Sequence, residues 1–400
     1  MSENLTKKYR TPTINMKVDN IKDKKAYGMS MDIGYSSVKI FAPNKIACFP
    51  AYARQVGGEQ ISFTYGTSEN HILYKESDDI IWSVGADAQN MMSVSETEDS
   101  VATLYGRNRY FSSMFRVISN VGLALGLKEN IYGKYFPYMP LYLKTGLPSK
   151  YISDKNDLIE ALSGHHDFYV KFGSKPWEHY SFDLAADNIF VMPQPMGTLQ
   201  SICTTKAGGK IPESKNYFNS NLLIIDPGFG TFDTFEIRHG YPSENNETYA
   251  NLGMKAVLQA TSNEIYKKYQ QKILVPAMQQ YLETGTIKVS SRQQGERRIK
   301  TSLVDFSDIL EKCNEEICNK ALDKLMTVYN NLEEIDYLVI TGGTGASWYK
   351  IIADYFKDME TLTVIPGNQN DANLDFIFAN ARGYYFSLID RLKLANKQNK

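Results

Sequence analysis

Two short stretches, far apart in the chain, place a carboxylate and glycine directly after an apolar run. The first is Asp32-Ile33-Gly34-Tyr35-Ser36, and the second is Asp226-Pro227-Gly228-Phe229-Gly230-Thr231. Glycine lets a backbone approach an anion closely, and a tight turn can point several N–H groups the same way. A neighbouring carboxylate can hold the metal ion of a phosphate through water. Taken alone, either stretch is better explained as an ordinary glycine hairpin between core strands.

The residues around both stretches predict β-hairpins. Leu222-Leu223-Ile224-Ile225 is a run of large aliphatic residues, typical of a strand buried on both faces. Apolar residues return after the turn at Phe232, Phe235 and Ile237, which indicates a return strand. The first stretch follows the same pattern, and its return strand carries Lys39. Two such hairpins together predict two related half-molecules that face one ligand.

Two further motifs could contribute to the same ligand site. The apolar strand Tyr337–Ile340 runs into a third glycine turn, Thr341-Gly342-Gly343-Thr344, and Val191-Met192-Pro193-Gln194 precedes the second hairpin. An amide does not take up a proton near pH 7, so Gln194 is unsuited to be a strong general base, but it can orient an attacking water. The alternative is that Gln194 is only a residue of a hinge loop.

Composition places the chain among ordinary globular proteins and sets limits on its partners. A length of 400 residues predicts two domains, and 42% hydrophobic with 22% charged residues argues against disorder. A net charge of −1 gives no electrostatic reason for direct nucleic-acid or membrane binding. The four cysteines form no Cys-x-x-Cys pair, which argues against a zinc site or a disulfide framework. With neither a secretory signal nor an apolar run near 20 residues, we expect a cytoplasmic protein.

The sequence also predicts how the chain divides into domains. We expect a flexible, mildly basic arm over residues 1–27, a first domain over 28–196 and a second domain over 197–379. A polar stretch containing Arg292, Arg297 and Arg298 suggests a peripheral subdomain at about 265–310. The closing helix, at about 380–396, is expected to pack back on the first domain.

The order of these motifs resembles the actin–Hsp70–sugar kinase ATPase superfamily. Asp32-Ile33-Gly34 with Lys39 resembles its first phosphate motif, Asp226 to Thr231 the second, and Thr341 to Thr344 the adenosine motif of actins. Val191 to Gln194 and Thr145-Gly146-Leu147-Pro148 narrow the resemblance to the ParM-like bacterial actins that segregate plasmids.

Three departures from that pattern stand out. Gln194 replaces the glutamate of ParM, although actin has a glutamine there. Tyr35 and Phe229 replace smaller residues in the two hairpins, so packing around the phosphates must differ. The basic arm has no counterpart.

The resemblance implies an actin-like α/β fold: two related domains with ribonuclease H-like cores, and peripheral subdomains around a nucleotide cleft. The implied ligands are ATP and Mg²⁺, with Asp32 and Asp226 holding the metal through water and acting in catalysis with Gln194. The implied nucleotide-binding residues are Gly34, Tyr35, Ser36, Lys39, Gly228, Phe229, Gly230, Thr231, Gly342, Gly343 and Thr344.

The implied function is an ATP-dependent filament that drives plasmid DNA segregation, with slow Mg²⁺-dependent hydrolysis timing its disassembly. Its partners would be further copies of itself and a DNA-binding adaptor at the filament end, with no membrane contact. One alternative is a membrane-associated scaffold, for which Leu388 to Leu394 is only faintly amphipathic. A less favoured one is a small-molecule kinase, which needs a base such as Asp233 or Asp187.

Overall fold

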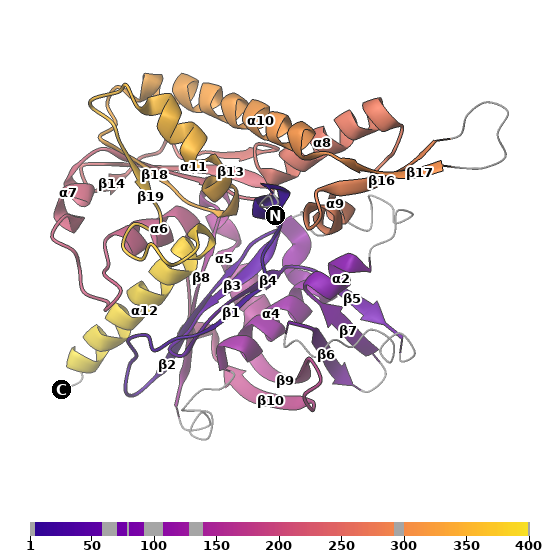
Figure 1. The fold of residues 1–400 in the computed structure, drawn as a ribbon. Coiled ribbons are helices and arrows are strands. Elements are labelled where there is room, and N and C mark those ends of the chain that lie inside the picture. The colour runs from indigo at the N-terminus through magenta and orange to yellow at the C-terminus, as the bar shows by residue number, and fades with distance from the viewer. Residues whose placement is uncertain are drawn as a thin grey trace.

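The computed structural model describes residues 5–57, 70–77, 80–91, 107–127, 139–291 and 300–398. These residues form three sheets of five or six strands, one two-stranded sheet and the helices that cover them (Figure 1). We refer to the part built on the first six-stranded sheet as domain I and the part built on the second as domain II. Within the described residues, no helix combines the length and apolar character needed to cross a membrane.

The sheet of domain I carries the first predicted hairpin at its centre. β2 and β3 pair antiparallel, whereas β2, β8 and β11 run parallel to one another. Helix α4 covers this sheet next to β3, and α12 lies against β2, β8 and α6. In sheet order the strands are β1 (Ile14–Lys17), β4 (Lys45–Pro50), β3 (Ser37–Phe41), β2 (Tyr27–Ile33), β8 (Leu141–Leu147) and β11 (Ile189–Pro193), and the helices are α4 (Ser113–Leu127), α6 (Gln194–Ile202) and α12 (Ala379–Gln398).

A subsidiary antiparallel sheet extends domain I beneath α4. Its strands, in sheet order, are β10 (Glu178–Leu184), β9 (Gly164–Phe172), β6 (Ile72–Ser77), β7 (Ile80–Val84) and β5 (Ala53–Val56). The short elements nearby are α2 (Ala86–Asn90), η2 (Arg107–Phe111), η4 (Ser149–Asp154), α5 (Lys155–Leu162) and η5 (Ala186–Asn188).

The sheet of domain II carries the second predicted hairpin. β12 lies between its antiparallel return strand β13 and the parallel strand β18. All of its residues are buried, so both faces are covered, as its aliphatic run predicts. The strands in sheet order are β14 (Tyr241–Pro242), β13 (Thr231–Arg238), β12 (Leu222–Pro227), β18 (Tyr337–Ile340) and β19 (Thr363–Pro366), with β15 (Thr248–Ala250) paired to β13. The remaining elements are α7 (Ser214–Asn219), α8 (Met254–Tyr269), α9 (Val275–Leu282), the pair β16 (Thr286–Ser291) and β17 (Lys300–Asp305), α10 (Ser307–Val328), η6 (Asn330–Leu332), α11 (Gly343–Phe356) and η7 (Phe376–Phe378).

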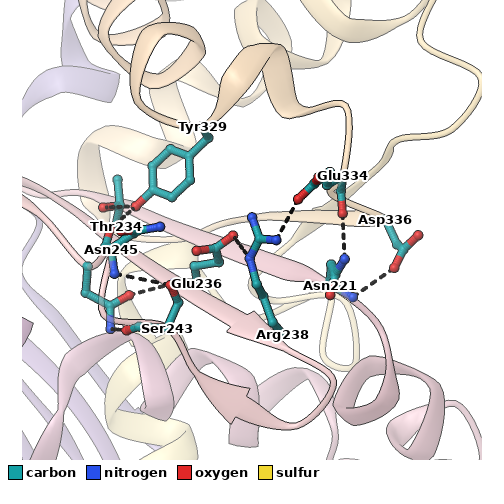
Figure 2. A network of polar contacts seen from close by, with 10 residues as sticks. Asn221, Thr234, Glu236, Arg238, Ser243, Asn245, Tyr329, Glu334 and Asp336 are labelled. Carbon is teal, nitrogen blue, oxygen red and sulfur yellow. Dashed lines mark hydrogen bonds and ion pairs between the residues drawn. The ribbon is translucent and has the colours of Figure 1, made fainter.

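A polar network fixes the start of β12 (Figure 2). Glu236 on β13 is fully buried and accepts a hydrogen bond of 2.7 Å from Nε of Arg238, whose Nη1 donates to Glu334 at 2.6 Å. Asn221, just before β12, donates through its backbone N–H to Asp336 at 2.8 Å and through Nδ2 to the Glu334 carbonyl at 2.9 Å. These bonds set the register of β12 against β18 at one end, and Asp226 lies at the other.

The N-terminal arm differs from its prediction. Leu5–Tyr9 forms a 3₁₀ helix, η1, and Ile14–Lys17 forms β1, which pairs antiparallel with β4. Ile14, Met16 and Val18 pack against an apolar cluster of domain I and α12. Their spacing of two is a strand pattern, which the high polar content of the arm hid. The expectation of a flexible arm is therefore wrong for these residues.

The interface between β8 and α12 buries a lysine. Lys144 Nζ donates to Ser387 Oγ at 2.6 Å, and burial together with the nearby Arg391 lowers the pKa of Lys144 to about 8. The folded state therefore disfavours the charged ammonium that the unfolded chain keeps up to its ordinary pKa of 10.5. Between these two values the unfolded chain holds the extra proton, so stability rises as the pH rises from about 8 to 10.5.

We therefore expect Lys144→Met to raise the free energy of unfolding by about 2 kcal/mol at pH 7. That gain should shrink as the pH approaches 10, because the wild-type lysine is neutral there. Urea unfolding at pH 7 and pH 10 measures both values. The exposed Lys155→Met is the matched control and should change stability by less than about 0.5 kcal/mol. A difference between Lys144→Met and wild type that did not vary with pH would contradict this account.

Candidate functional site

One cleft collects almost all of the residues that the motifs single out. It is lined by residues from both hairpins, by the third glycine turn and by the start of α6. The predicted residues that line it are Asp32, Gly34, Tyr35, Ser36, Lys39, Gln194, Asp226, Gly228, Phe229, Thr231, Gly342, Gly343 and Thr344. Gly230 is absent from the lining.

The first hairpin brings a lysine onto an aspartate. Asp32 and Lys39 are opposite each other in the β2–β3 register, and Lys39 Nζ donates to Asp32 Oδ2 at 3.1 Å. Burial lowers the pKa of Lys39, but the Asp32 carboxylate outweighs it and the net pKa is raised, so the ammonium stays charged. The N–H of Gly34 closes the turn by donating to the Ser37 carbonyl at 3.0 Å. The strand register thus explains why this lysine follows its aspartate by seven residues.

The second hairpin is fixed by the start of α8. The Gly228 N–H donates to the Thr231 carbonyl at 2.8 Å, which closes the turn. The carbonyls of Gly228 and Phe229 accept the N–H groups of Met254 and Lys255, at 3.2 and 2.8 Å. The side chain of Phe229 packs against the apolar core of domain II. The aromatic residue at the tip therefore anchors the turn to its own domain.

Asp226 is a buried carboxylate whose charge is costly. Asn380, at the start of α12, donates through Nδ2 to Asp226 Oδ2 at 2.7 Å. Burial raises the pKa of Asp226 to about 6, and the charge of Asp32 adds to the rise, whereas Asn380 and Lys39 oppose it. Two carboxylates that face one cleft and repel each other form a suitable environment for a cation between them.

A third carboxylate, Asp233, also lines the cleft from β13. Burial raises its pKa to about 7, although Thr248 and Thr231 both donate hydrogen bonds to it. Asp187, the other acid considered for a kinase, is exposed in η5.

Gln194 and Asn380 reach the cleft because two helices cross at close range. Gln194 begins α6, and its Nε2 donates to Asp32 Oδ1 at 3.1 Å. A Cβ added to Gly383 of α12 would lie 1.7 Å from the carbonyl oxygen of Gly197 in α6, so the crossing requires glycine. This contact places the first residues of both helices beside the aspartates.

The third glycine turn completes the cleft from domain II. Gly342 has a φ of +80°, and a Cβ there would lie 2.2 Å from Asp226 Oδ1. Only glycine fits this position. The next residue begins the 14-residue helix α11, and Thr344 Oγ1 donates to the Gly228 carbonyl at 2.7 Å. A helix N-terminus that opens on a cleft favours an anionic ligand.

Sequence reasoning missed several residues of this cleft. Arg109 in η2 donates to the carbonyls of Gly34 and Ile33, and its guanidinium lies 4.5 Å from the centre of the Tyr35 ring. The Tyr35 ring reaches the other hairpin, since a Cβ on Gly230 would lie 3.2 Å from Tyr35 Cδ2. No spacing signal marks Arg109 or Asn380. The N-terminal residues Lys7 to Pro12 also line the cleft.

Comparison with known proteins agrees with this geometry. Residues 30–197 match the family model for the N-terminal domain of actin-like proteins. Residues 30–197 are therefore similar to the N-terminal domain of actin-like proteins. No curated protein matches the sequence. The chain has an actin-like α/β fold, with two mixed sheets and a subsidiary antiparallel sheet, as in bacterial and archaeal actin homologues.

Solved structures share the fold at low sequence identity. A non-polymerisable quadruple mutant of pCBH ParM has a TM-score of 0.68 at 18% identity, over 92% of this chain and 99% of that chain. A 15-stranded ParM filament from Clostridium botulinum has a TM-score of 0.66 at 18% identity, with the same coverage. The archaeal actin homologue Ta0583, in complex with ADP, has a TM-score of 0.62 at 16% identity, over 91% and 99% of the two chains.

Proposed function

We propose that this protein is an ATP-dependent, filament-forming actin-like protein that segregates plasmid DNA. The observation that carries the proposal is the cleft itself, in which Asp32 with Lys39 faces Asp226 and the Gly342 turn. The similar structures support it, because they include a ParM filament and an ADP complex of an archaeal actin homologue.

ATP would lie between the two hairpins, with its phosphates near Lys39. The N–H groups of Gly34 and Gly228 close their own turns. The phosphates would therefore be held mainly by N–H groups later in each turn, at Tyr35, Ser36 and Phe229. The N-terminus of α11 adds favourable dipoles.

Asp32 and Asp226 would hold Mg²⁺ through water, since that ion keeps much of its hydration shell. Bound there, the ion would neutralise charge on the phosphates. Gln194, held by Asp32, would orient the attacking water without taking its proton. Hydrolysis without a strong general base would be slow, which suits a nucleotide that times disassembly. We place the protein in the cytoplasm. Its partners would be further copies of the same chain in the filament and a DNA-bound adaptor at the filament end.

The test is assembly. Purified protein with Mg-ATP should scatter light above a critical concentration and show filaments in negative stain, and chelation of Mg²⁺ should prevent turnover. Protein that stayed monomeric with Mg-ATP at high concentration would refute the filament. Binding to lipid vesicles would instead favour the scaffold alternative.

A small-molecule kinase is the less favoured alternative, and Asp233 is the residue that supports it. Its raised pKa, near 7, suits a base, but its oxygens accept hydrogen bonds from Thr231 and Thr248. Turnover that rose only when a sugar was added would favour the kinase over the filament.

A further inference from the structure

The N-terminal segment crosses from one domain to the other beside the cleft. β1 belongs to the sheet of domain I, whereas η1 contacts α9, α10 and α11 of domain II. Figure 1 shows η1, in indigo at the N label, beside α9. Residues Lys7 to Pro12 line the same cleft as the two hairpins. We refer to residues 6–12 as the strap.

The strap is anchored to domain II by buried groups. Tyr9 is 5% exposed and packs within the apolar core of that domain. Thr6 is 1% exposed and donates through Oγ1 to the Leu282 carbonyl at 2.7 Å. The Thr11 N–H donates to Gln279 Oε1 at 3.0 Å. A buried aromatic ring with flanking hydrogen bonds makes this a specific docking contact.

Three cations extend the docking contact to the surface. Arg10 and Lys7 both pair with Glu283, the latter at 3.1 Å, and Lys8 pairs with Glu311 at 3.5 Å. Lys7 and Lys8 are largely exposed, so their ion pairs hold the strap only weakly. Their positive charge nevertheless lies beside the cleft, where it would attract a polyanionic ligand.

The connection between the two attachments is short. Thr11 is bonded to Gln279 of domain II, and Ile14 is paired with Cys48 of domain I. Three residues of extended chain span at most about 11 Å. Any motion that moves these two attachments farther apart than that reach must break one of them. β1 is held by a four-residue strand pairing, so the contact of the strap with α9 and α10 is the one expected to break. Docking of the strap and opening of the cleft are therefore competing states.

We propose that the strap is part of the nucleotide site: it closes one side of the cleft, retains the bound nucleoside triphosphate or diphosphate, and must detach before the nucleotide exchanges. This inference rests on the nucleotide binding of the proposed function. It assigns a role in the site to the basic N-terminal segment, which has no counterpart in the motif pattern of the ParM-like actins.

The experiment measures release of a fluorescent ATP analogue, mant-ATP, after mixing with excess ATP. Tyr9→Ala should speed release by at least about tenfold, because the main anchor is lost. Tyr9→Phe keeps the ring and should release mant-ATP much more slowly than Tyr9→Ala does. Tyr241→Ala, which truncates an exposed tyrosine on β14, is the matched control and should release mant-ATP at the wild-type rate.

A charge swap gives a second test outside the apolar core. Arg10→Glu and Glu283→Arg should each speed release several-fold, about fivefold by the strength of a charge-assisted pair. The double variant Arg10→Glu/Glu283→Arg should return toward the wild-type rate. If Tyr9→Ala failed to fold, the three charge variants would still test whether the strap retains the nucleotide.

The outcomes distinguish failure of the strap proposal from failure of the proposed function on which it rests. If folded Tyr9→Ala released mant-ATP at the wild-type rate, or if all the charge variants did, the role of the strap in nucleotide exchange would be refuted. Nucleotide binding by the cleft would still stand. Failure of wild-type protein to bind mant-ATP at all would overturn the proposed function itself.

Discussion

Replacing Asp226 by alanine is expected to reduce ATP turnover by about 10²–10³-fold. Asp226 lies at the end of β12 with Asn380 on one oxygen and the Gly342 turn against the other. Without its carboxylate, one of the two groups proposed to hold hydrated Mg²⁺ is lost. Binding of Mg²⁺ by the wild type should also weaken as the pH drops through about 6, where Asp226 of the metal-free protein takes up a proton.

Asp226→Asn shows whether turnover is lost because the carboxylate charge is missing or because the fold is destabilised. The raised pKa of Asp226 means that the folded protein holds a proton there that the unfolded chain has lost, between 3.8 and about 6. That contribution to stability is present below pH 3.8 and is lost as the pH rises through about 6. At pH 7 the buried charge is a cost of roughly 3 kcal/mol, so the neutral amide should leave the nucleotide-free protein at least as stable.

Steady-state phosphate release and thermal unfolding measure the two effects separately. The control is Asp187→Ala, which removes an exposed carboxylate outside the lining of the cleft. Undiminished turnover in Asp226→Ala would refute the assignment of Asp226 to the Mg²⁺ site. If Asp226→Asn were unfolded, the conclusion that the buried charge of Asp226 costs stability would be wrong.

Gln194→Ala is expected to lower turnover by about 10- to 100-fold and to leave assembly intact. Its amide is held at 3.1 Å from Asp32, so it presents a fixed polar group to the attacking water. Because hydrolysis is proposed to time disassembly, filaments of this variant should persist longer after ATP is depleted. Turbidity decay and phosphate release, recorded on the same sample, test the link.

Two further variants sharpen that test. Gln200→Ala, on the same helix outside the lining of the cleft, should match wild type. Gln194→Glu would place a second carboxylate beside Asp32, so its turnover should depend more steeply on pH than that of the wild type. If Gln194→Ala filaments disassembled at the wild-type rate, the timing role would be wrong.

Local sequence was enough to find both hairpins because their signals are local. The apolar run of β12, the glycine turn and the return strand are contiguous, and the register that pairs Asp32 with Lys39 follows from the length of the turn. The actin-like fold predicted from the order of these motifs is confirmed by the family match and the shared architecture.

Contacts between distant segments left no such signal. Asn380 meets Asp226 only because α12 crosses α6 at Gly383, and Arg109 reaches Gly34 from a separate element. The polar residues of the arm outnumber its apolar ones, which predicts a flexible segment, yet Tyr9 is buried in the core of domain II. Composition cannot reveal a binding place that other segments provide.

The sequence by itself therefore determined the chemical groups of the cleft: two aspartates at strand ends, a lysine on a return strand, a glutamine before the second hairpin and three glycine turns. Only the tertiary structure decided that these groups meet in one cleft, which amide holds Asp226, and that a basic strap lines the cleft beside them. The physical reason is that such contacts depend on how helices and sheets pack, and packing is set by shape and burial across the whole chain.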